Sequence, residues 1–503
     1  MKKIFLALIS VAFTLASCDM DKSPEGSTTD TDALNSVEKC KSFRNGLYTY
    51  MRSVTTGGFI ILSDIQLDDF HAVRGNGNRL MDFYNGNILA TTSEVASIYG
   101  GYYSVIAGTN FLINGVEERI ETGFYPQDSR HELNRYLGEA YFIRGFSYSN
   151  LADKFCGSYK HAEDLGKEGL GLSLQTTYAP TGDNTTYPGR SSLRATYNLI
   201  LSDISKADSL LSLYEENYYT EPMAMSQYIT SDVAKALKAR VYLNMGYDEE
   251  AAKTAESLIN TERYPLATYN DYRKMWTDDS ATEILWRVQM DLNHQGSATG
   301  SNFLSQTQNP DYIPTNTTAY LYSDNDIRLL SCLGDAILEE SGTKVYISGF
   351  TKYPGNPELY ATGASSNYAN MSKPFRASEL YLIAAEGYAN IGQEELANFY
   401  LSSIQSQRIR NYRNKTYSGV DLIAEIYDER HRELLGEGFR MADLKRWNMG
   451  FTRGETQYGA DAFVYSLNRQ LSYEADDYRL VWPIPKDELD ANPQIKDQQN
   501  PGY

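Results

Sequence analysis

Cysteine and histidine are scarce in this sequence, and the few that occur are spread apart. Only 4 of the 503 residues are Cys and 5 are His. Cys40, Cys156 and Cys332 are widely separated, which fits neither a disulfide framework nor a CxxC metal site. No HExxH motif is present. We therefore predict no metal site, and we expect these three cysteines to be small buried apolar side chains.

The motifs of the common enzyme classes are absent too. No G-x-S-x-G sequence and no Walker loop occurs, and Gly75-x-Gly77 lacks the third glycine of a dinucleotide turn. We predict no cofactor, no catalytic residues and no enzymatic activity. A surface glycoside hydrolase is the alternative. Its weakness is that among 65 acidic residues some pair will reach the carboxylate separation of such an enzyme by chance alone.

Positive charge is under-represented as well. The chain has 46 Lys and Arg against 65 Asp and Glu, which gives a formal net charge of −19 and a pI near 4.8. Nucleic acids and anionic lipids attract cationic surfaces, so we expect neither as a partner. Beyond the N-terminal segment, no run is long and apolar enough for a transmembrane helix.

The N-terminus reads as a targeting segment. Lys2 and Lys3 precede an apolar run over residues 4–15, and Leu15-Ala16-Ser17-Cys18 follows. This order resembles the bacterial lipobox, in which the thiol takes a diacylglyceryl group. We predict a lipoprotein signal peptide over residues 1–17, lipid attachment at Cys18 and a flexible, polar tether over residues 18–32.

Tyrosine is the residue in excess. The chain holds 41 Tyr against 18 Phe and 4 Trp. A tyrosine side chain has a flat apolar face and a polar tip. Surfaces that stack on sugar rings or on peptides use such side chains.

Two segments repeat one helix–turn–helix spacing. Ala239-x-x-Tyr242 and Ala385-x-x-Tyr388 are each followed by a turn that contains glycine and by a second helical segment. The spacing partly matches the tetratricopeptide pattern. A third, discontinuous pair is predicted over residues 134–154 and 192–213, with further helices over 37–51, 92–122 and 421–435. The regions 52–90 and 263–375 are irregular, with strand-like runs at 283–289 and 344–348.

Residues 429–447 combine acidic and basic side chains at helical spacing. Glu429, Glu433 and Glu437 recur every four residues, so their charges would repel one another on one helix face. Arg430, Arg432, Arg440 and Arg446 are available as partners, and Gly436 and Gly438 would end the helix. We predict a partly buried carboxylate–guanidinium network that fixes how two helices meet, rather than a general acid–base pair.

This run resembles the signature of the SusD/RagB family, E-R-x-x-E-L-x-x-E-G-x-R-x-x-D-L-x-R-W. The matching residues include Glu429, Arg430, Glu433, Glu437, Gly438, Arg440, Asp443, Arg446 and Trp447. The chain end, with Pro483-Ile484-Pro485 and Gln499-Asn500-Pro501-Gly502-Tyr503, resembles the family's closing motif. Gly138-Glu139-Ala140 with Arg144 resembles another of its helices.

The resemblance implies a mostly α fold, SusD-like, with tetratricopeptide-like helix pairs and a large irregular region of loops and short strands that binds the ligand. It implies residues 33–225 as the N-terminal helical part and residues 226–503 as the C-terminal part. It also implies an outer-membrane lipoprotein of Bacteroidetes-type bacteria, which captures oligosaccharides, or in some members peptides, for a TonB-dependent SusC-like transporter.

The family places its ligand in loops, which directs attention to two of them here. The residue types suited to hydrogen-bonding hydroxyl groups and stacking on sugar rings are Asp69, Arg74, Asn76, Arg79 and Tyr84 in the first loop, and Asn293, His294, Tyr312 and Tyr320 in the second. Asn and Asp are also common turn formers, so a purely structural role stays open for each. A tetratricopeptide-type scaffold that binds protein tails is a further alternative.

Overall fold

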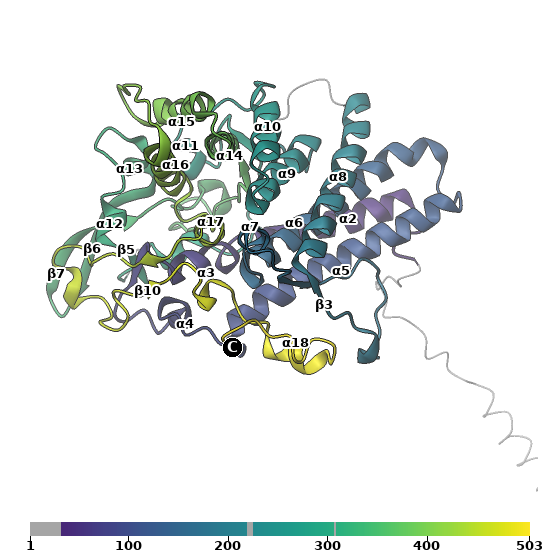
Figure 1. Ribbon diagram of the computed structural model, residues 1–503, viewed down its shortest axis with the longest axis horizontal. Helices are drawn as coiled ribbons and strands as arrows, with labels where there is room; N and C mark the ends of the chain where they lie inside the picture. Colours follow the sequence, from purple (N-terminus) through teal and green to yellow (C-terminus); the bar gives the residue numbers. More distant parts are fainter. Residues whose placement is uncertain (1–31, 219–224, 306–307) are drawn as a thin grey trace, which may run out of the picture.

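The computed structural model describes residues 32–218, 225–305 and 308–503. The predicted signal peptide, Cys18 and nearly all of the predicted tether lie outside the described residues. Figure 1 shows the helices gathered across the top and right of the molecule, while short strands and loops fill its lower left. No helix among the described residues is both long and apolar enough to cross a membrane.

Four long helices pack side by side in the N-terminal half. They are α2 (Val37–Val54), α5 (Ser93–Glu121), α6 (Arg130–Phe155) and α8 (Leu193–Tyr218). The predicted ranges are confirmed, with ends displaced by a few residues. Helix α6 meets α8 at a glycine, because a Cβ on Gly138 of α6 would lie only 2.8 Å from Leu211 Cγ of α8.

The two repeated helix pairs are α9 (Ser231–Met245) with α10 (Asp248–Ile259), and α14 (Ala377–Asn390) with α15 (Glu394–Arg408). Each tight turn contains a glycine at φ +76°, Gly246 in the first and Gly392 in the second. Helix α10 packs on α14, so the two pairs stack on each other. The prediction of tetratricopeptide-like helix pairs is confirmed.

Helices α16 (Gly419–Leu434) and α17 (Arg440–Trp447) follow the second pair, and α16 packs on α14 and α15. The remaining helices are short: α3 (Gly58–Gln66), α4 (Met81–Tyr84), α7 (Tyr159–Asp164), α11 (Lys274–Thr277), α12 (Asn316–Ala319), α13 (Ile327–Cys332) and α18 (Lys486–Ala491). All of them lie in the irregular regions or at the chain end, where they connect the larger elements.

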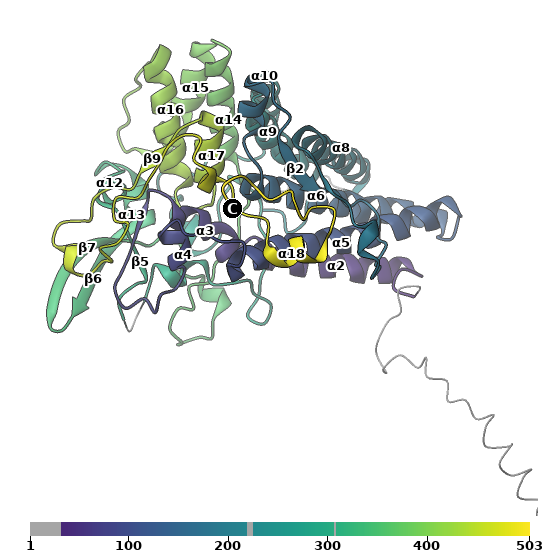
Figure 2. The ribbon, with the colours of Figure 1, turned by 60° about the horizontal axis from the view of Figure 1, so that its bottom comes forward.

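The described strands form two-stranded antiparallel sheets. The pairs are β1 (Phe70–Ala72) with β5 (Tyr312–Pro314), β2 (Leu170–Ser173) with β3 (Arg190–Ser192), β4 (Ile284–Trp286) with β8 (Phe375–Arg376), β6 (Leu333–Glu340) with β7 (Thr343–Phe350), and β9 (Phe451–Thr452) with β10 (Ser472–Tyr473). The β6–β7 hairpin projects from the edge of the molecule (Figure 2).

One large hydrophobic core runs under the helices, and a smaller one lies under the loops. Cys40, Cys156 and Cys332 are buried and unpaired, as predicted. Burial raises the pKa of each of these three thiols, so they stay protonated. The mostly α architecture is confirmed, and the division of the chain at residue 225 stays a prediction.

Candidate ligand-binding face

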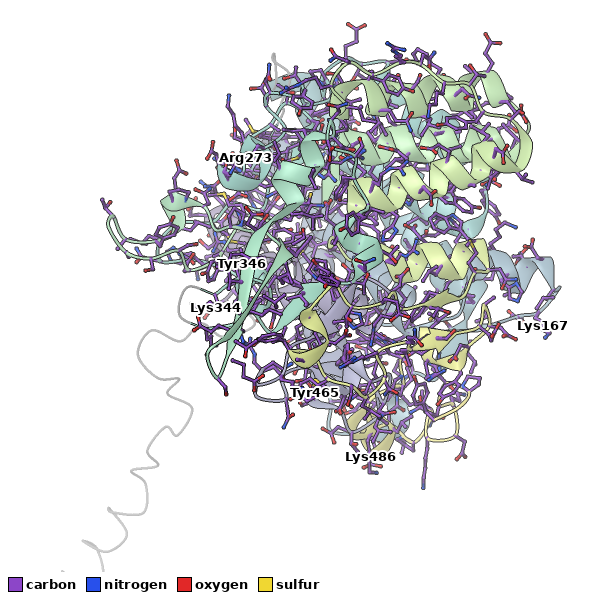
Figure 3. The ribbon with its side chains drawn as sticks, turned by 90° about the vertical axis from the view of Figure 1, so that its left-hand side faces the viewer. Lys167, Arg273, Lys344, Tyr346, Tyr465 and Lys486 are labelled. Atoms are coloured by element: carbon purple, nitrogen blue, oxygen red, sulfur yellow. The ribbon has the colours of Figure 1, made fainter. Side chains whose placement is uncertain are left out.

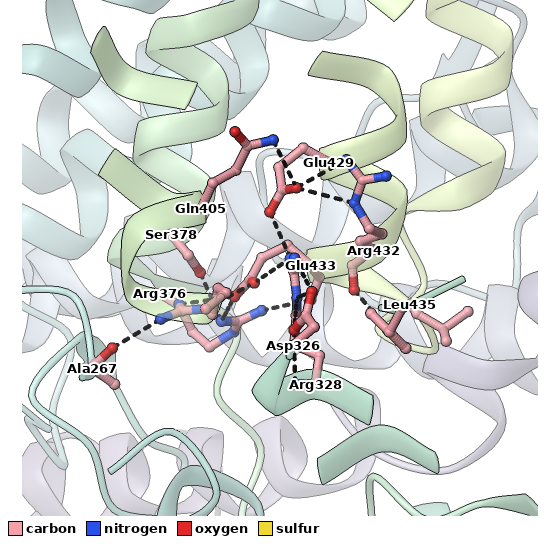
Figure 4. A network of polar contacts seen from close by, with 12 residues as sticks. Ala267, Asp326, Arg328, Arg376, Ser378, Gln405, Glu429, Arg432, Glu433 and Leu435 are labelled. Atoms are coloured by element: carbon pink, nitrogen blue, oxygen red, sulfur yellow. Dashed lines mark hydrogen bonds and ion pairs between the residues drawn. The ribbon is translucent and has the colours of Figure 1, made fainter. Parts of the chain in front are cut away.

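The carboxylates of the 429–447 run lie in a buried ionic network (Figure 4). Glu433 lies within 3.2 Å of Arg328, 2.9 Å of Arg376 and 3.0 Å of Arg408. Glu429 pairs with Arg328, and Arg376 also contacts Glu283. Three of the guanidinium groups therefore come from segments outside the run itself.

The partners expected from within the run mostly bind elsewhere, and this part of the prediction was wrong. Only Arg432 pairs with one of the three glutamates, Glu429. Arg430 pairs with Asp443, and Arg446 pairs with Glu386 and Asp443. Trp447 donates its indole N–H to Glu386. The physical reason is that α16 turns its glutamates toward neighbouring elements, away from the arginines that follow them in the chain.

The network keeps its carboxylates ionised. Burial alone would raise the pKa of Glu433, but Arg408, Arg376 and Arg328 outweigh it and hold that pKa well below its usual range. The pKa values of Glu429 and Glu437 are also lowered against burial, by Arg328 and Arg376 respectively. A carboxyl group that stays ionised cannot act as a general acid, so none of these three glutamates suits that role.

The end of α16 and the segment that follows it bind the start of the first loop through hydrogen bonds and an ion pair. The backbone N–H of Gly438 donates to Asp64 Oδ2 at 3.0 Å, and Arg440 Nη2 donates to Asp68 Oδ2 at 2.7 Å. His431 Nε2 lies 2.9 Å from Asp69 Oδ1. Burial opposes it, but Arg440 lowers the pKa of Asp68 to about 2. Three successive contacts therefore hold residues 64–69 against the signature run.

The smaller core supports a group of loops that are distant in the sequence. It contains Val73 of the first loop, Ile313 of β5, Leu338 and Ile347 of the β6–β7 hairpin, and Val464. The Gln457 side chain joins two of these elements, since it donates to Pro314 O at 2.9 Å and accepts from Ser348 N at 2.8 Å. Residues 73–84, the hairpin and residues 455–470 are thereby packed together, and we call them the platform.

Tyrosine rings stand exposed on this platform. Tyr458 is 97% exposed and Tyr346, on β7, is 76% exposed. Tyr465 is half-buried and donates to Asn78 Oδ1 at 3.2 Å. Figure 3 shows Tyr346 and Tyr465 on the same side of the molecule. We use the name tyrosine face for four side chains of the platform, Arg79, Tyr346, Tyr458 and Tyr465.

Comparison with known proteins identifies the family. A model described as the SusD family matches residues 173–503, and a model described as starch-binding associating with outer membrane matches residues 20–243. The chain belongs to the SusD family. A SusD-like protein of Formosa agariphila is 24% identical over 560 residues, covering 99% of this chain and 98% of its own length.

Solved structures agree with this membership. A SusD superfamily protein from Bacteroides thetaiotaomicron matches with a TM-score of 0.76 and 29% identity, over 93% of this chain and 100% of its own. A candidate sugar-binding protein of Bacteroides vulgatus matches with a TM-score of 0.74 and 25% identity, over 94% and 99% of the two chains. The family predicted from the signature is thus confirmed.

Several residues predicted to contact a SusD-type ligand have buried side chains. The Tyr84 ring lies beneath the Arg453 guanidinium, whose carbon is 4.2 Å from the centre of the ring. The Tyr312 hydroxyl donates to the backbone oxygen of Arg79 at 2.6 Å. Asn76 Oδ1 accepts from Asn78 N at 3.0 Å, which is a turn-forming contact. Asp69 also accepts from Thr318 at 2.9 Å. These four side chains shape the loops from inside.

Other predicted residues reach the surface. Arg79 is 51% exposed in its side chain and pairs with Asp311 at 2.6 Å. Arg74 is exposed, although its Nε donates to Val464 O at 3.2 Å. Tyr320 is 80% exposed at the end of α12, which packs beside β5. The structure thus brings Arg74 and Arg79 together on the platform, with Tyr320 on a neighbouring element.

Asn293 and His294 form a separate group. Both backbone N–H groups donate to Asp291 Oδ1, at 2.8 and 2.9 Å, in an exposed turn. This turn precedes Ser297, whose N–H bonds to Thr56 near the junction of α2 and α3. Within the described residues, no contact joins Asn293 or His294 to the tyrosine face.

Sequence reasoning missed Tyr346, Tyr458 and Tyr465. For Tyr346 a signal existed, because residues 343–350 alternate between outward and inward side chains as a half-buried strand does. Tyr346 lies opposite Ile337 in the hairpin register, so the two share the outer face. For Tyr458 and Tyr465 no local pattern marks exposure, because loop positions lack periodicity.

Proposed function

We propose that this chain is a cell-surface lipoprotein, anchored through Cys18, that binds oligosaccharides and delivers them to a SusC-like TonB-dependent transporter. The proposal rests on membership of the SusD family and on the match of residues 20–243 to a model described as starch-binding associating with outer membrane. The candidate sugar-binding protein of Bacteroides vulgatus, whose fold this chain shares, supports the cargo class.

The tyrosine face suits such a ligand. Exposed phenol rings such as Tyr346 and Tyr458 offer apolar surfaces to the C–H faces of sugars. Arg79 supplies guanidinium N–H groups on the same platform, and Arg74 adds a second cation on the same loop as Arg79. The platform beneath is packed on its own core, so the site needs little ordering on binding. Among the predicted residues, Tyr84, Tyr312, Asn76 and Asp69 would position this face, while Tyr320 would extend it.

Peptides are the second cargo class. Tyrosine faces and arginine side chains also bind peptide bonds and acidic side chains, so the same surface is compatible with them. Asn293, His294 and the exposed Leu292 beside them form a polar and apolar turn away from the face. We propose this turn as a secondary contact for a long ligand only.

Binding without cleavage is part of the proposal. A glycoside hydrolase needs two carboxyl groups that flank its substrate, one of them protonated. The glutamates of the signature are buried and held ionised by arginines, so they supply no such pair.

Docking of the stacked helix pairs on the transporter would leave the tyrosine face free to hold cargo. A tetratricopeptide-type scaffold would instead bind its ligand on those helices.

The test uses the chain from residue 19, which contains every described residue. Calorimetry against starch oligosaccharides, other glycans and peptides would give the cargo class, and chromatography of each mixture would detect products. We expect binding with no new product. For the glycan that binds, Tyr458→Ala and Tyr346→Ala should each weaken affinity roughly tenfold, or about 1.4 kcal/mol. Tyr50→Ala, on the exposed side of α2, is the matched control and should change nothing.

Three results would contradict the proposal. Release of shorter glycans would favour the hydrolase. Glycan binding that both face variants leave intact would move the site elsewhere on the molecule. An unmodified Cys18 would refute the lipid anchor. Mass spectrometry of the chain extracted from membranes should show a diacylglyceryl group on Cys18, and Cys18→Ala should release the protein from the membrane.

A further inference from the structure

A small cavity lies where the helical core, the signature run and the irregular region meet. Its volume is about 100 Å³, and it is bordered by α3, α6, α9, α17 and residues 370–374. The aromatic part of its wall consists of Phe59, Tyr102, Phe146, Trp276, Tyr353 and Phe439. A protein cavity of about 150 Å³ holds one benzene molecule, so this space suits a molecule of only a few atoms. None of the residues predicted to bind ligand lines it.

The buried lining atoms that lack a partner are N–H donors. Arg430 Nη1 and Trp276 Nε1 are buried and hydrogen-bond to none of the described residues. Lys154 is 5% exposed, and its ammonium makes neither a hydrogen bond nor an ion pair within residues 32–218, 225–305 and 308–503. Leaving a buried donor unsatisfied costs about 1–3 kcal/mol, and more for a charged one. Whatever occupies this cavity must therefore accept hydrogen bonds.

The other cations of the wall already have their counter-charges. Arg240 pairs with Glu379 at 2.6 Å, and Lys373 pairs with Asp279 at 2.7 Å. Lys154 is the lining cation without an ion pair among the described residues: Asp153 and Asp64 favour its charge only from a longer range, and burial outweighs them and lowers its pKa. An ammonium buried without a partner is costly, so an anion beside it would be strongly favoured.

The carboxylates of the wall are engaged with other groups. Glu437 is held by Arg376 and Lys352, and Asp443 by Arg430 and Arg446. Asp153 accepts from Asn244 Nδ2 at 3.2 Å, and burial raises its pKa.

Asp64, next to the cavity behind Gly438, is also a poor counter-ion for Lys154. Burial, reinforced by Asp69, raises the pKa of Asp64 to about 8. Its carboxyl group is therefore mostly protonated near neutral pH and offsets the ammonium only weakly.

We propose that this cavity binds one small anion, of the size of a halide or acetate, which accepts hydrogen bonds from Lys154 and Arg430. Lys154 belongs to the last turn of α6 and Arg430 to α16, while Trp276 belongs to α11. The anion thus ties the N-terminal helices to the signature run and to the irregular region. It is a structural counter-ion, separate from the cargo of the tyrosine face.

Bromide is the probe, because its anomalous scattering separates it from water. Crystals of the chain from residue 19 grown in sodium bromide should show an anomalous peak within hydrogen-bonding distance of Lys154 Nζ. Lys154→Met should abolish the peak, whereas the exposed Lys41→Met should keep it. Water alone in the wild-type cavity would overturn the proposal. A peak that survives in Lys154→Met would be an adventitious ion only and would overturn it too.

A solution measurement covers the case in which Lys154→Met does not crystallise. The thermal midpoint of wild-type protein should be higher in sodium chloride than in sodium gluconate at equal ionic strength, since gluconate is too large for the cavity. Lys154→Met should lose this difference and Lys41→Met should retain it. Trp276→Phe keeps an aromatic side chain, though a smaller one, and removes the indole N–H donor, so it should reduce the difference. Equal midpoints of wild-type protein in the two salts would contradict anion binding.

Discussion

Replacing Glu433 by Gln tests the buried ionic network at its centre. The substitution keeps the size of the side chain and removes the negative charge that Arg328, Arg376 and Arg408 share. All four side chains are at most 2% exposed, so water cannot replace the lost charge. The amide nitrogen of the new side chain would also face guanidinium N–H groups, because glutamine has only one acceptor oxygen.

Removing one partner from a buried ion pair costs about 3–5 kcal/mol, and we expect Glu433→Gln to fall in that range. Arg376 and Arg408 keep Glu283 as a partner, which limits the loss to this order. Urea unfolding followed by circular dichroism at neutral pH would measure it as a lower midpoint with an unchanged slope.

The matched control is Glu425→Gln at the rim of the same network. Glu425 pairs with Arg432 at 2.5 Å, and both side chains are about one-fifth exposed, at 22% and 19%. A partly solvated pair contributes about 0–1 kcal/mol, so the control should unfold nearly as the wild type does. A loss below about 1 kcal/mol for Glu433→Gln, or equal losses for the two variants, would refute the reasoning.

Three further predictions concern buried titratable groups and a turn. The pKa of Asp64 is raised to about 8 in the folded protein, so the stability that the protonated Asp64 contributes is lost as pH rises from about 4 to 8. Asp64→Asn should therefore be more stable than wild type above about pH 8. Burial, with Arg453, lowers the pKa of His71 to about 4, so urea midpoints should fall as pH drops from about 6.5 to 4, and less so in His71→Gln. Gly436 has φ +72°, and a Cβ at this position would overlap the Phe350 ring. Gly436→Ala should therefore lower the free energy of unfolding in urea by about 1–3 kcal/mol. Gly123 has φ +70° in open space, so Gly123→Ala should cost less. Equal losses for the two glycine variants would show that the Phe350 contact is unimportant.

Helix positions could be predicted from the sequence because periodicity is a local property. The spacing of Ala239 and Tyr242 indicates a helix wherever it packs, and Gly246 marks its end through backbone geometry alone. The partners of Glu433 could not be predicted in the same way. Arg328 lies 105 residues away in the chain, and nothing near it indicates which of many carboxylates it will meet.

The first loop shows why site residues are harder to predict than helices. Its polar and aromatic composition correctly marks an irregular segment, yet composition does not tell which way a side chain points. Tyr84 turns inward because the Arg453 guanidinium covers its ring and α4 packs against β1. Arg79 turns outward on the same loop, although its carbonyl accepts from the buried Tyr312. Only the tertiary contacts decide between the two.

The signature run does two tasks, and its glycines make both possible. Up to Glu433 the chain is helical and directs its carboxylates into the core. Gly436 and Gly438 then adopt positive φ, at +72° and +83°, and reverse the chain so that the N–H of Gly438 and the guanidinium of Arg440 reach Asp64 and Asp68. Because the segment before the first loop is bound at these points, the loop cannot shift without breaking buried polar contacts. A ligand on the tyrosine face would therefore contact loops whose position depends on residues 429–447, the same run that supplies the buried carboxylates.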